Sequence, residues 1–181
     1  MSTRIFTLLF CATSLFGQET ALELDPAQTH VDFTVGSTLH TVHGSFQLMR
    51  GNIHYDLASG TASGEIVIDA KSGQSGNDSR DKKMHKDILE SQRYPEIVFI
   101  PDRVEGSLAE ARVHGTIKIH GQDHELTLPV RAGALQEQIN ITTHFAIPYI
   151  QWGMKNPSTL FLRVNDKVEI EIRAVGRKPA S

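Results

Sequence analysis

Cysteine is almost absent from this sequence: among 181 residues the chain has one, Cys11. It lies in the apolar run of residues 5–16, which follows Arg4 and has the length of a signal-peptide hydrophobic region, but is too short to span a bilayer as a helix. A lipoprotein signal needs small residues before its cysteine, and Leu9 and Phe10 stand there instead. We therefore expect residues 1–18 to be a cleaved signal peptide of a periplasmic or secreted protein. The mature chain then has no disulfide and no catalytic thiol.

An excess of positive charge is also missing. Lys and Arg number 18 against 21 Asp and Glu, and no basic cluster is longer than Lys82-Lys83. Binding to nucleic acid needs a basic surface that neutralises phosphates. Composition therefore argues against nucleic acid as a partner. The roughly 160 residues after the signal suit a single domain with an adequate core.

The familiar catalytic motifs are missing as well. The sequence contains no G-x-S-x-G, no H-E-x-x-H and no glycine-rich phosphate loop between a strand and a helix. Residues 73–76, Gly-Gln-Ser-Gly, have a different spacing and lie in a polar stretch. Carboxylates are scattered along polar strand faces, so no pair of general acid and base can be assigned. We expect a binding protein rather than an enzyme, with no catalytic residue and no cofactor.

Nine histidines are many for this length and raise the question of a metal site. His40 and His43 are three apart, which places them on opposite faces of a strand. His120 and His124 are four apart across a glycine turn, where two imidazoles can meet. Structural zinc usually has four ligands and often includes cysteine, which the mature chain does not supply. We expect no metal site, and metal binding by the histidines stays open.

Alternation of apolar and polar residues, by contrast, runs through most of the chain with the period of two that is typical of half-buried β-strands. Six segments alternate strictly, and two more, 64–70 and 96–104, are rich in β-formers. The strict segments are 31–35, 42–48, 113–119, 126–130, 139–147 and 168–174. One apolar face per strand and short polar turns predict an antiparallel meander. Eight such strands can close into a barrel without exposed edges. A two-sheet sandwich has the same periodicity and stays open as the alternative.

A helical insertion interrupts the strands near residues 78–90. Met84 and Ile88 are four apart there, and Asn77 or Asp78 can cap the start. We expect this helix to lie over one end of the barrel or along its side.

Two further features concern strand ends. Pro129 has no amide donor, so it predicts a strand end, a bulge or a locally unpaired stretch in segment 126–130. Residues 148–160 predict a long loop before the last strand. Trp152 in this loop can line a ligand entrance or close the end of the barrel, and the sequence does not separate the two.

Four segments, which follow one another in the same order along the chain, carry a resemblance to a known family. They are residues 25–29 (Asp-Pro-Ala-Gln-Thr) with Val31 and Phe33; residues 42–46; Arg80-Asp81 with Met84-His85, Leu89 and residues 94–99; and residues 113–121. With these segments the chain resembles the YceI-like family of polyisoprenoid-binding periplasmic β-barrel proteins over residues 22–176. Gln28 replaces the family's early histidine and Thr29 its serine, so the bound lipid can differ from the family's usual one.

The resemblance implies an all-β, eight-stranded antiparallel lipocalin-like barrel with the short helical insertion near residues 78–90. It also implies an apolar tunnel for a long-chain polyisoprenoid or an isoprenoid quinone-like lipid, held for transport, storage or sequestration. We expect the small inward residues Gly44 and Gly115 to leave space in this tunnel. The inward strand residues expected to line it are Phe33, Val35, Phe46, Leu48, Ile68, Phe99, Ile117, Ile119, Leu126, Leu128, Ile141, Phe145 and Ile170.

The densest set of charges in the chain, around Arg80, is the candidate contact for a lipid head group. Its members in this hypothesis are Arg80, Asp81 and His85, with Trp152 from the long loop. The alternative is an ordinary solvated helix face. For the whole protein, the alternative to lipid binding is a filled barrel that acts as a stress or interaction module beside a membrane redox partner. Transient contact with a membrane or a membrane protein is compatible with both hypotheses, and the oligomeric state stays open.

Overall fold

Alternating residues form nine strands in the computed structural model, which describes residues 19–135 and 138–179. The predicted signal peptide, residues 1–18, lies outside the described residues. The strands are β1 (Thr20–Leu24), β2 (His30–Gly36), β3 (Thr41–Asp56), β4 (Thr61–Gln74), β5 (Glu96–Gly106), β6 (Ala111–Ile119), β7 (Gln122–Leu135), β8 (Gln138–Ile147) and β9 (Val168–Arg177). Every pairing between them is antiparallel.

The nine strands fill eight positions around a closed barrel, because β1 and β2 share one position between β3 and β9. Leu22 of β1 pairs with the far part of β3 at Ile53, whereas Phe33 of β2 pairs with Gly44 near the start of β3. A short 3-10 turn, η1 (Pro26–Gln28), separates the two strands. Pairing of β3 with β4 closes the circle. The predicted eight-stranded barrel is confirmed, and the sandwich alternative is wrong.

Strand β3 is longer than the alternation predicted, because irregular pairing changes the face that points inward. Its register with β4 shifts between Ser45 and Gln47 and again between Leu48 and Arg50. A bulge inserts one residue and so reverses which side chains face the core. The period-two pattern therefore breaks after Leu48, although the strand continues to Asp56.

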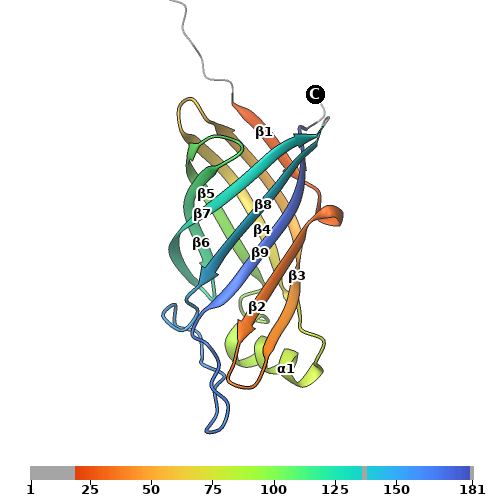
Figure 1. The fold of residues 1–181 in the computed structure, drawn as a ribbon, viewed down its shortest axis with the longest axis vertical. Helices are drawn as coiled ribbons and strands as arrows, with labels where there is room; N and C mark the ends of the chain where they lie inside the picture. The colour runs from red at the N-terminus through yellow and green to blue at the C-terminus, as the bar shows by residue number, and fades with distance from the viewer. Residues whose placement is uncertain (1–18, 136–137, 180–181) are drawn as a thin grey trace, which may run out of the picture.

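Pro129 marks the point where two neighbouring strands stop pairing. Strand β7 pairs with β6 on both sides of Pro129, which itself lies opposite Arg112. Its ladder with β8 begins only at Val130, which lies opposite Thr143. Proline has no N–H to donate to a ladder. The prediction of a locally unpaired stretch is thus confirmed on the β8 side, and β7 and β8 diverge below this point (Figure 1).

The helical insertion consists of α1 (Asp78–Lys83) followed by a single π-type turn, η2 (Met84–Ile88). Asn77, one of the two expected caps, accepts a hydrogen bond from the Arg80 amide at 3.0 Å. The insertion lies at the lower end of the barrel in Figure 1, where Met84 and Ile88 pack against the core. The expectation of a helix over one end is confirmed. No helix in the described part of the chain is long and apolar enough to cross a membrane.

The two ends of the barrel differ in their connections (Figure 1). The lower end carries the β2–β3 turn, the helical insertion, the β6–β7 turn and the loop of residues 148–167. The upper end carries the β3–β4 and β5–β6 turns, the start of β1 and the end of β9.

Candidate ligand cavity

The interior of the barrel contains two apolar lobes that follow one another along its axis. The upper lobe has a volume of about 130 Å³ and the lower lobe about 190 Å³. Six side chains line both lobes and therefore form a waist between them in mid-barrel. The waist residues are Val31, Ile66, Ile68, Phe99, Leu128 and Ile172. Among the described residues no charged side chain lines either lobe. Such a space suits a long apolar ligand or a set of packed side chains.

All thirteen side chains predicted from the inward strand faces line this interior. Ile68, Phe99 and Leu128 lie at the waist, and Leu48 and Ile141 line the upper lobe alone. The remaining eight line the lower lobe: Phe33, Val35, Phe46, Ile117, Ile119, Leu126, Phe145 and Ile170. Their contact with a ligand stays a prediction.

The cavity has further walls that the strand pattern missed. Leu22 and Leu24 of β1 line the upper lobe, and Ile53 and Tyr55 line it from the part of β3 beyond its bulges. The lower lobe is closed by non-strand residues, namely Met84, Ile88, Leu89, Tyr149, Met154, Pro157 and Val164. The four-residue spacing of Met84 and Ile88 was the available signal for part of this set.

The two inward glycines do not leave open space, contrary to the expectation. A Cβ atom on Gly44 would lie 2.3 Å from Cζ of Phe33, and one on Gly115 would lie 2.9 Å from Cζ of Phe99. Both positions also approach a backbone carbonyl at 2.3 Å, that of Gln74 or Ile100. The phenyl rings therefore occupy the room that the missing side chains provide.

One buried hydroxyl in the upper lobe has no partner. Oγ1 of Thr143 is buried and accepts or donates no hydrogen bond among the described residues. The hydroxyl of Thr29, which lines the same lobe, donates to the Asp25 carbonyl at 2.8 Å. A buried polar group without a partner is costly, so this hydroxyl lowers the stability of the ligand-free protein.

Sequence comparison places this architecture in a family: a model of the YceI-like domain matches residues 22–176. The chain belongs to the YceI-like family. None of the curated proteins matches it.

Solved structures support the YceI-like fold. Burkholderia cenocepacia BcnA is similar with a TM-score of 0.72 and 19% identity, over 84% of this chain and 98% of that one. A polyisoprenoid binding domain from Saccharophagus degradans, implicated in plant cell wall breakdown, gives 0.70 and 16%, over 88% and 99%. The Campylobacter jejuni YCEI protein gives 0.57 and 15%, over 99% and 92%. At these identities the likeness concerns the fold.

In this YceI-like barrel, Arg80 and Asp81 use their polar atoms within the chain. The Ser75 amide donates to the two Asp81 carboxylate oxygens at 3.0 and 3.1 Å, and the Ser75 hydroxyl also binds that carboxylate. Arg80 donates to the Ser75 hydroxyl at 2.7 Å and to the Ser75 carbonyl at 2.9 Å. Desolvation alone would raise the pKa of Asp81, but these bonds and the charges of Arg80 and His85 hold it below its ordinary value. The network joins the end of β4 to the start of α1.

His85 forms a second link between the same elements. Its Nε2 lies 2.8 Å from the Gly73 carbonyl, and its Nδ1 lies 3.0 Å from the hydroxyl of the buried Ser91. Because a carbonyl can only accept, Nε2 carries a proton. Asp81 and His85 also border a polar surface groove with Lys82 and Lys86, and neither lines the interior lobes. Their contact with a lipid head group stays a prediction.

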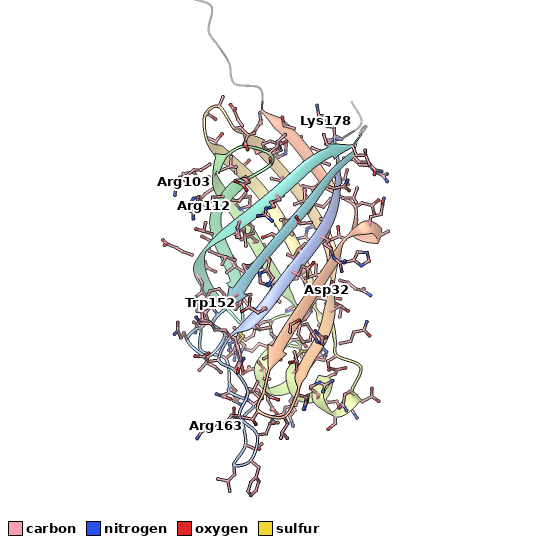
Figure 2. All side chains as sticks on the ribbon, viewed as in Figure 1. Asp32, Arg103, Arg112, Trp152, Arg163 and Lys178 are labelled. Atoms are coloured by element: carbon pink, nitrogen blue, oxygen red, sulfur yellow. The ribbon has the colours of Figure 1, made fainter. Side chains whose placement is uncertain are left out.

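Trp152, the fourth head-group candidate, lies at the lower end of the barrel (Figure 2). Its indole stacks on the imidazole of His124 with ring centroids 4.2 Å apart and an angle of 5° between the planes. It packs against the lower part of the core and lines neither lobe.

The other histidine of the pair His120 and His124, which the sequence raised as a possible metal site, has an acidic neighbour: Nε2 of His120 lies 3.4 Å from a carboxylate oxygen of Glu90. No group of three metal-ligating side chains occurs in the described residues.

The hydroxyl of Tyr149 joins the two ends of the long loop of residues 148–167. It donates to the Asn165 carbonyl at 2.7 Å. Burial, with a smaller effect from the charge of Asp166, raises the pKa of Tyr149 to about 12. The phenol therefore stays protonated over the physiological range, and the bond persists.

Proposed function

We propose that this protein binds one long apolar lipid, a polyisoprenoid or an isoprenoid quinone-like molecule, in the two lobes of its barrel and catalyses no reaction. The observation that carries the proposal is the pair of charge-free lobes that meet at the waist. An extended chain can occupy both lobes, whereas a compact ligand would leave one empty. The similar structure from Saccharophagus degradans, a polyisoprenoid binding domain, supports the same ligand class.

Selectivity in this proposal comes from shape and from few polar contacts. Each buried CH₂ contributes about 0.8 kcal/mol relative to water, but a lipid taken from a membrane is already sheltered, so most of that gain cancels. The length of the two lobes then remains to discriminate among lipids, and the buried hydroxyl of Thr143 adds a polar contact only if it turns toward the upper lobe. Arg80, Asp81 and His85 contribute by holding the helical insertion over the lower lobe.

The proposal also includes export. Residues 1–18 act as the signal peptide, and the protein carries, stores or sequesters its lipid outside the cytoplasm. Fractionation of cells that express the full chain checks this part. Recovery of the uncleaved protein from the cytoplasm alone would contradict it.

Native mass spectrometry combined with lipid extraction tests the ligand. We expect a reproducible prenyl or quinone mass on protein purified from lipid-replete cells. Ile172 lies at the waist and is half-buried, so Ile172→Trp should block the passage between the lobes and remove the adduct. Ile100→Trp, on the exposed face of β5, is the matched control and should keep the adduct.

A filled barrel without a ligand is the second candidate, and the rings of Phe33 and Phe99 over the two glycines favour it. Side-chain packing would then complete the core, and the protein would act through its surface. If native mass spectra show no lipid on wild-type protein in any preparation from lipid-replete cells, this second candidate is correct.

A further inference from the structure

Residues Thr159 and Leu162 close a narrow turn that presents two apolar side chains. The Thr159 amide donates to the Leu162 carbonyl at 2.8 Å, and the Leu162 amide donates to the Thr159 hydroxyl at 3.2 Å. The two residues between them, Leu160 and Phe161, are 90% and 87% exposed. No other large hydrophobic side chain in the described residues is as exposed. Apolar side chains gathered on a projection indicate a contact site.

The loop that carries this tip is fixed on both of its arms. On the returning arm, the Thr38 amide donates to the Arg163 carbonyl at 2.9 Å, which continues the edge of β2. On the outgoing arm, the Lys83 ammonium of α1 donates to the Pro157 carbonyl at 3.3 Å. The loop therefore projects in a defined direction, beyond the lower end of the barrel (Figure 1).

Another exposed apolar side chain, that of Leu39, lies on the neighbouring turn. Leu39 in the β2–β3 turn is 74% exposed, and the bond between Thr38 and Arg163 keeps the two turns together. At the upper end Leu57 and Leu108 are only 36% and 39% exposed, because both line the upper lobe. Leu39, Leu160 and Phe161 at the lower end line neither lobe.

The loop that carries the apolar tip has a net positive charge. The loop of residues 148–167 carries Lys155, Arg163 and Lys167 against a single carboxylate, Asp166. Arg163 stands on this loop below the barrel wall in Figure 2. Leucine and aromatic side chains enter the interface of a bilayer, while lysine and arginine meet anionic head groups at its surface. A stable protein interface needs about 800 Å² from each partner, which a two-residue tip does not provide.

We propose that the lower end of the barrel docks on an anionic lipid bilayer, with Leu160 and Phe161 inserted in the interface and Leu39 beside them. Pro157 and Val164 from the same loop line the lower lobe. Docking in this orientation places that lobe at the bilayer surface and leaves the upper end in solvent. The inference goes beyond lipid binding in the cavity and holds for a filled barrel as well.

Co-sedimentation of the purified protein with vesicles of phosphatidylethanolamine and phosphatidylglycerol tests the docking. We expect wild-type protein to bind, and the double variant Leu160→Ser with Phe161→Ser to partition at least about tenfold more weakly, because it loses two buried apolar side chains. Arg163→Glu and added salt should each weaken binding, and vesicles of phosphatidylcholine should bind less. Leu135→Ser removes a side chain that is 63% exposed at the upper end and should change nothing.

Three binding results would overturn the proposal: no binding by the wild type, equal binding by the double variant, or equal loss in Leu135→Ser. A wild-type dimer in light scattering that the double variant converts to monomer also overturns it, in favour of self-association. Thermal unfolding by circular dichroism checks that the tip variant folds. The vesicles contain no isoprenoid, and native mass spectra of the double variant report cavity binding separately. Docking and lipid binding can therefore fail independently.

Discussion

The phenyl ring of Phe33 lies directly over Gly44, its cross-strand partner in the β2–β3 pair. The position that a Cβ on Gly44 would take is 2.3 Å from Cζ of the ring. An aromatic side chain that covers a glycine on the next strand shields the exposed backbone and fixes the register of the pair. In this barrel the same contact narrows the lower lobe, so it sets both strand pairing and cavity shape.

Gly44→Ala should therefore destabilise the protein by about 1–3 kcal/mol, the usual range for overpacking. The new methyl group meets the ring of Phe33 and the carbonyl oxygen of Gln74, and the carbonyl cannot move aside. Urea unfolding measures the loss. Gly133→Ala is the matched control, because nothing lies within 4 Å of its Cβ position. It should be neutral or slightly stabilising. Equal stability of both variants would show that the ring does not occupy this position.

Thr143→Val should stabilise the ligand-free protein by about 1 kcal/mol, because it replaces a buried hydroxyl that lacks a partner with a methyl group of the same shape. Thr29→Val is the comparison and should lose about 1 kcal/mol, because the Thr29 hydroxyl donates to the Asp25 carbonyl. Thermal unfolding of the delipidated proteins measures both. If the hydroxyl binds the lipid, Thr143→Val should also retain less lipid in native mass spectra. A loss of stability in Thr143→Val would mean that the hydroxyl has a partner.

Asp81→Asn should weaken folding by about 1 kcal/mol near neutral pH, after allowance for solvent screening. The pKa of Asp81 is lower in the folded protein, so the contribution of the carboxylate is present above the ordinary carboxyl pKa. This contribution is lost as pH falls through the pKa that Asp81 has in the folded protein. The stability difference between wild type and variant should thus shrink toward acid pH. Asp102→Asn, an exposed carboxyl on β5, is the control. A difference that does not depend on pH would exclude the charge of Asp81 as the cause.

The strand pattern was enough to predict the antiparallel strands and thirteen cavity side chains, because a period of two reports directly which residues face inward. The choice of a barrel over a sandwich came from the family resemblance. The strand pattern failed where the period changes. In β3 the register shift between Leu48 and Arg50 reverses the inward face, so Ile53 and Tyr55 were missed. Strand β1 has only five residues, of which two, Leu22 and Leu24, face inward, too few for periodicity to register.

Contacts between distant segments lay beyond the sequence for a different reason. The stack of Trp152 on His124 and the bonds of Asp81 to Ser75 depend on how loops return to the barrel, which no local pattern encodes. We expected Gly44 to leave empty space, because alternation does not report the rotamer of Phe33, which is set by packing. The charged residues around Arg80 suggested a head-group site, whereas in the structure Arg80 and Asp81 both bond to Ser75. His85 bonds to Gly73 and Ser91.

Tyr149→Phe should loosen the two ends of the long loop. It removes the bond from the Tyr149 hydroxyl to the Asn165 carbonyl, at an expected cost of about 1 kcal/mol. Hydrogen exchange should increase in residues 155–167, and lipid should exchange faster through the lower lobe. Tyr55→Phe, in the upper lobe, is the control and should leave the loop unchanged.

The same variant should also differ from the wild type in how its stability depends on pH in the alkaline range. Burial raises the pKa of Tyr149 from 10.0 to about 12, so folding favours the neutral phenol. Its contribution to stability is complete below the unfolded pKa and is lost as pH rises through the folded value. Wild-type stability should therefore fall between pH 10 and about 12 more steeply than that of Tyr149→Phe. Parallel curves for the two proteins in urea unfolding at alkaline pH would mean that this phenol is open to solvent.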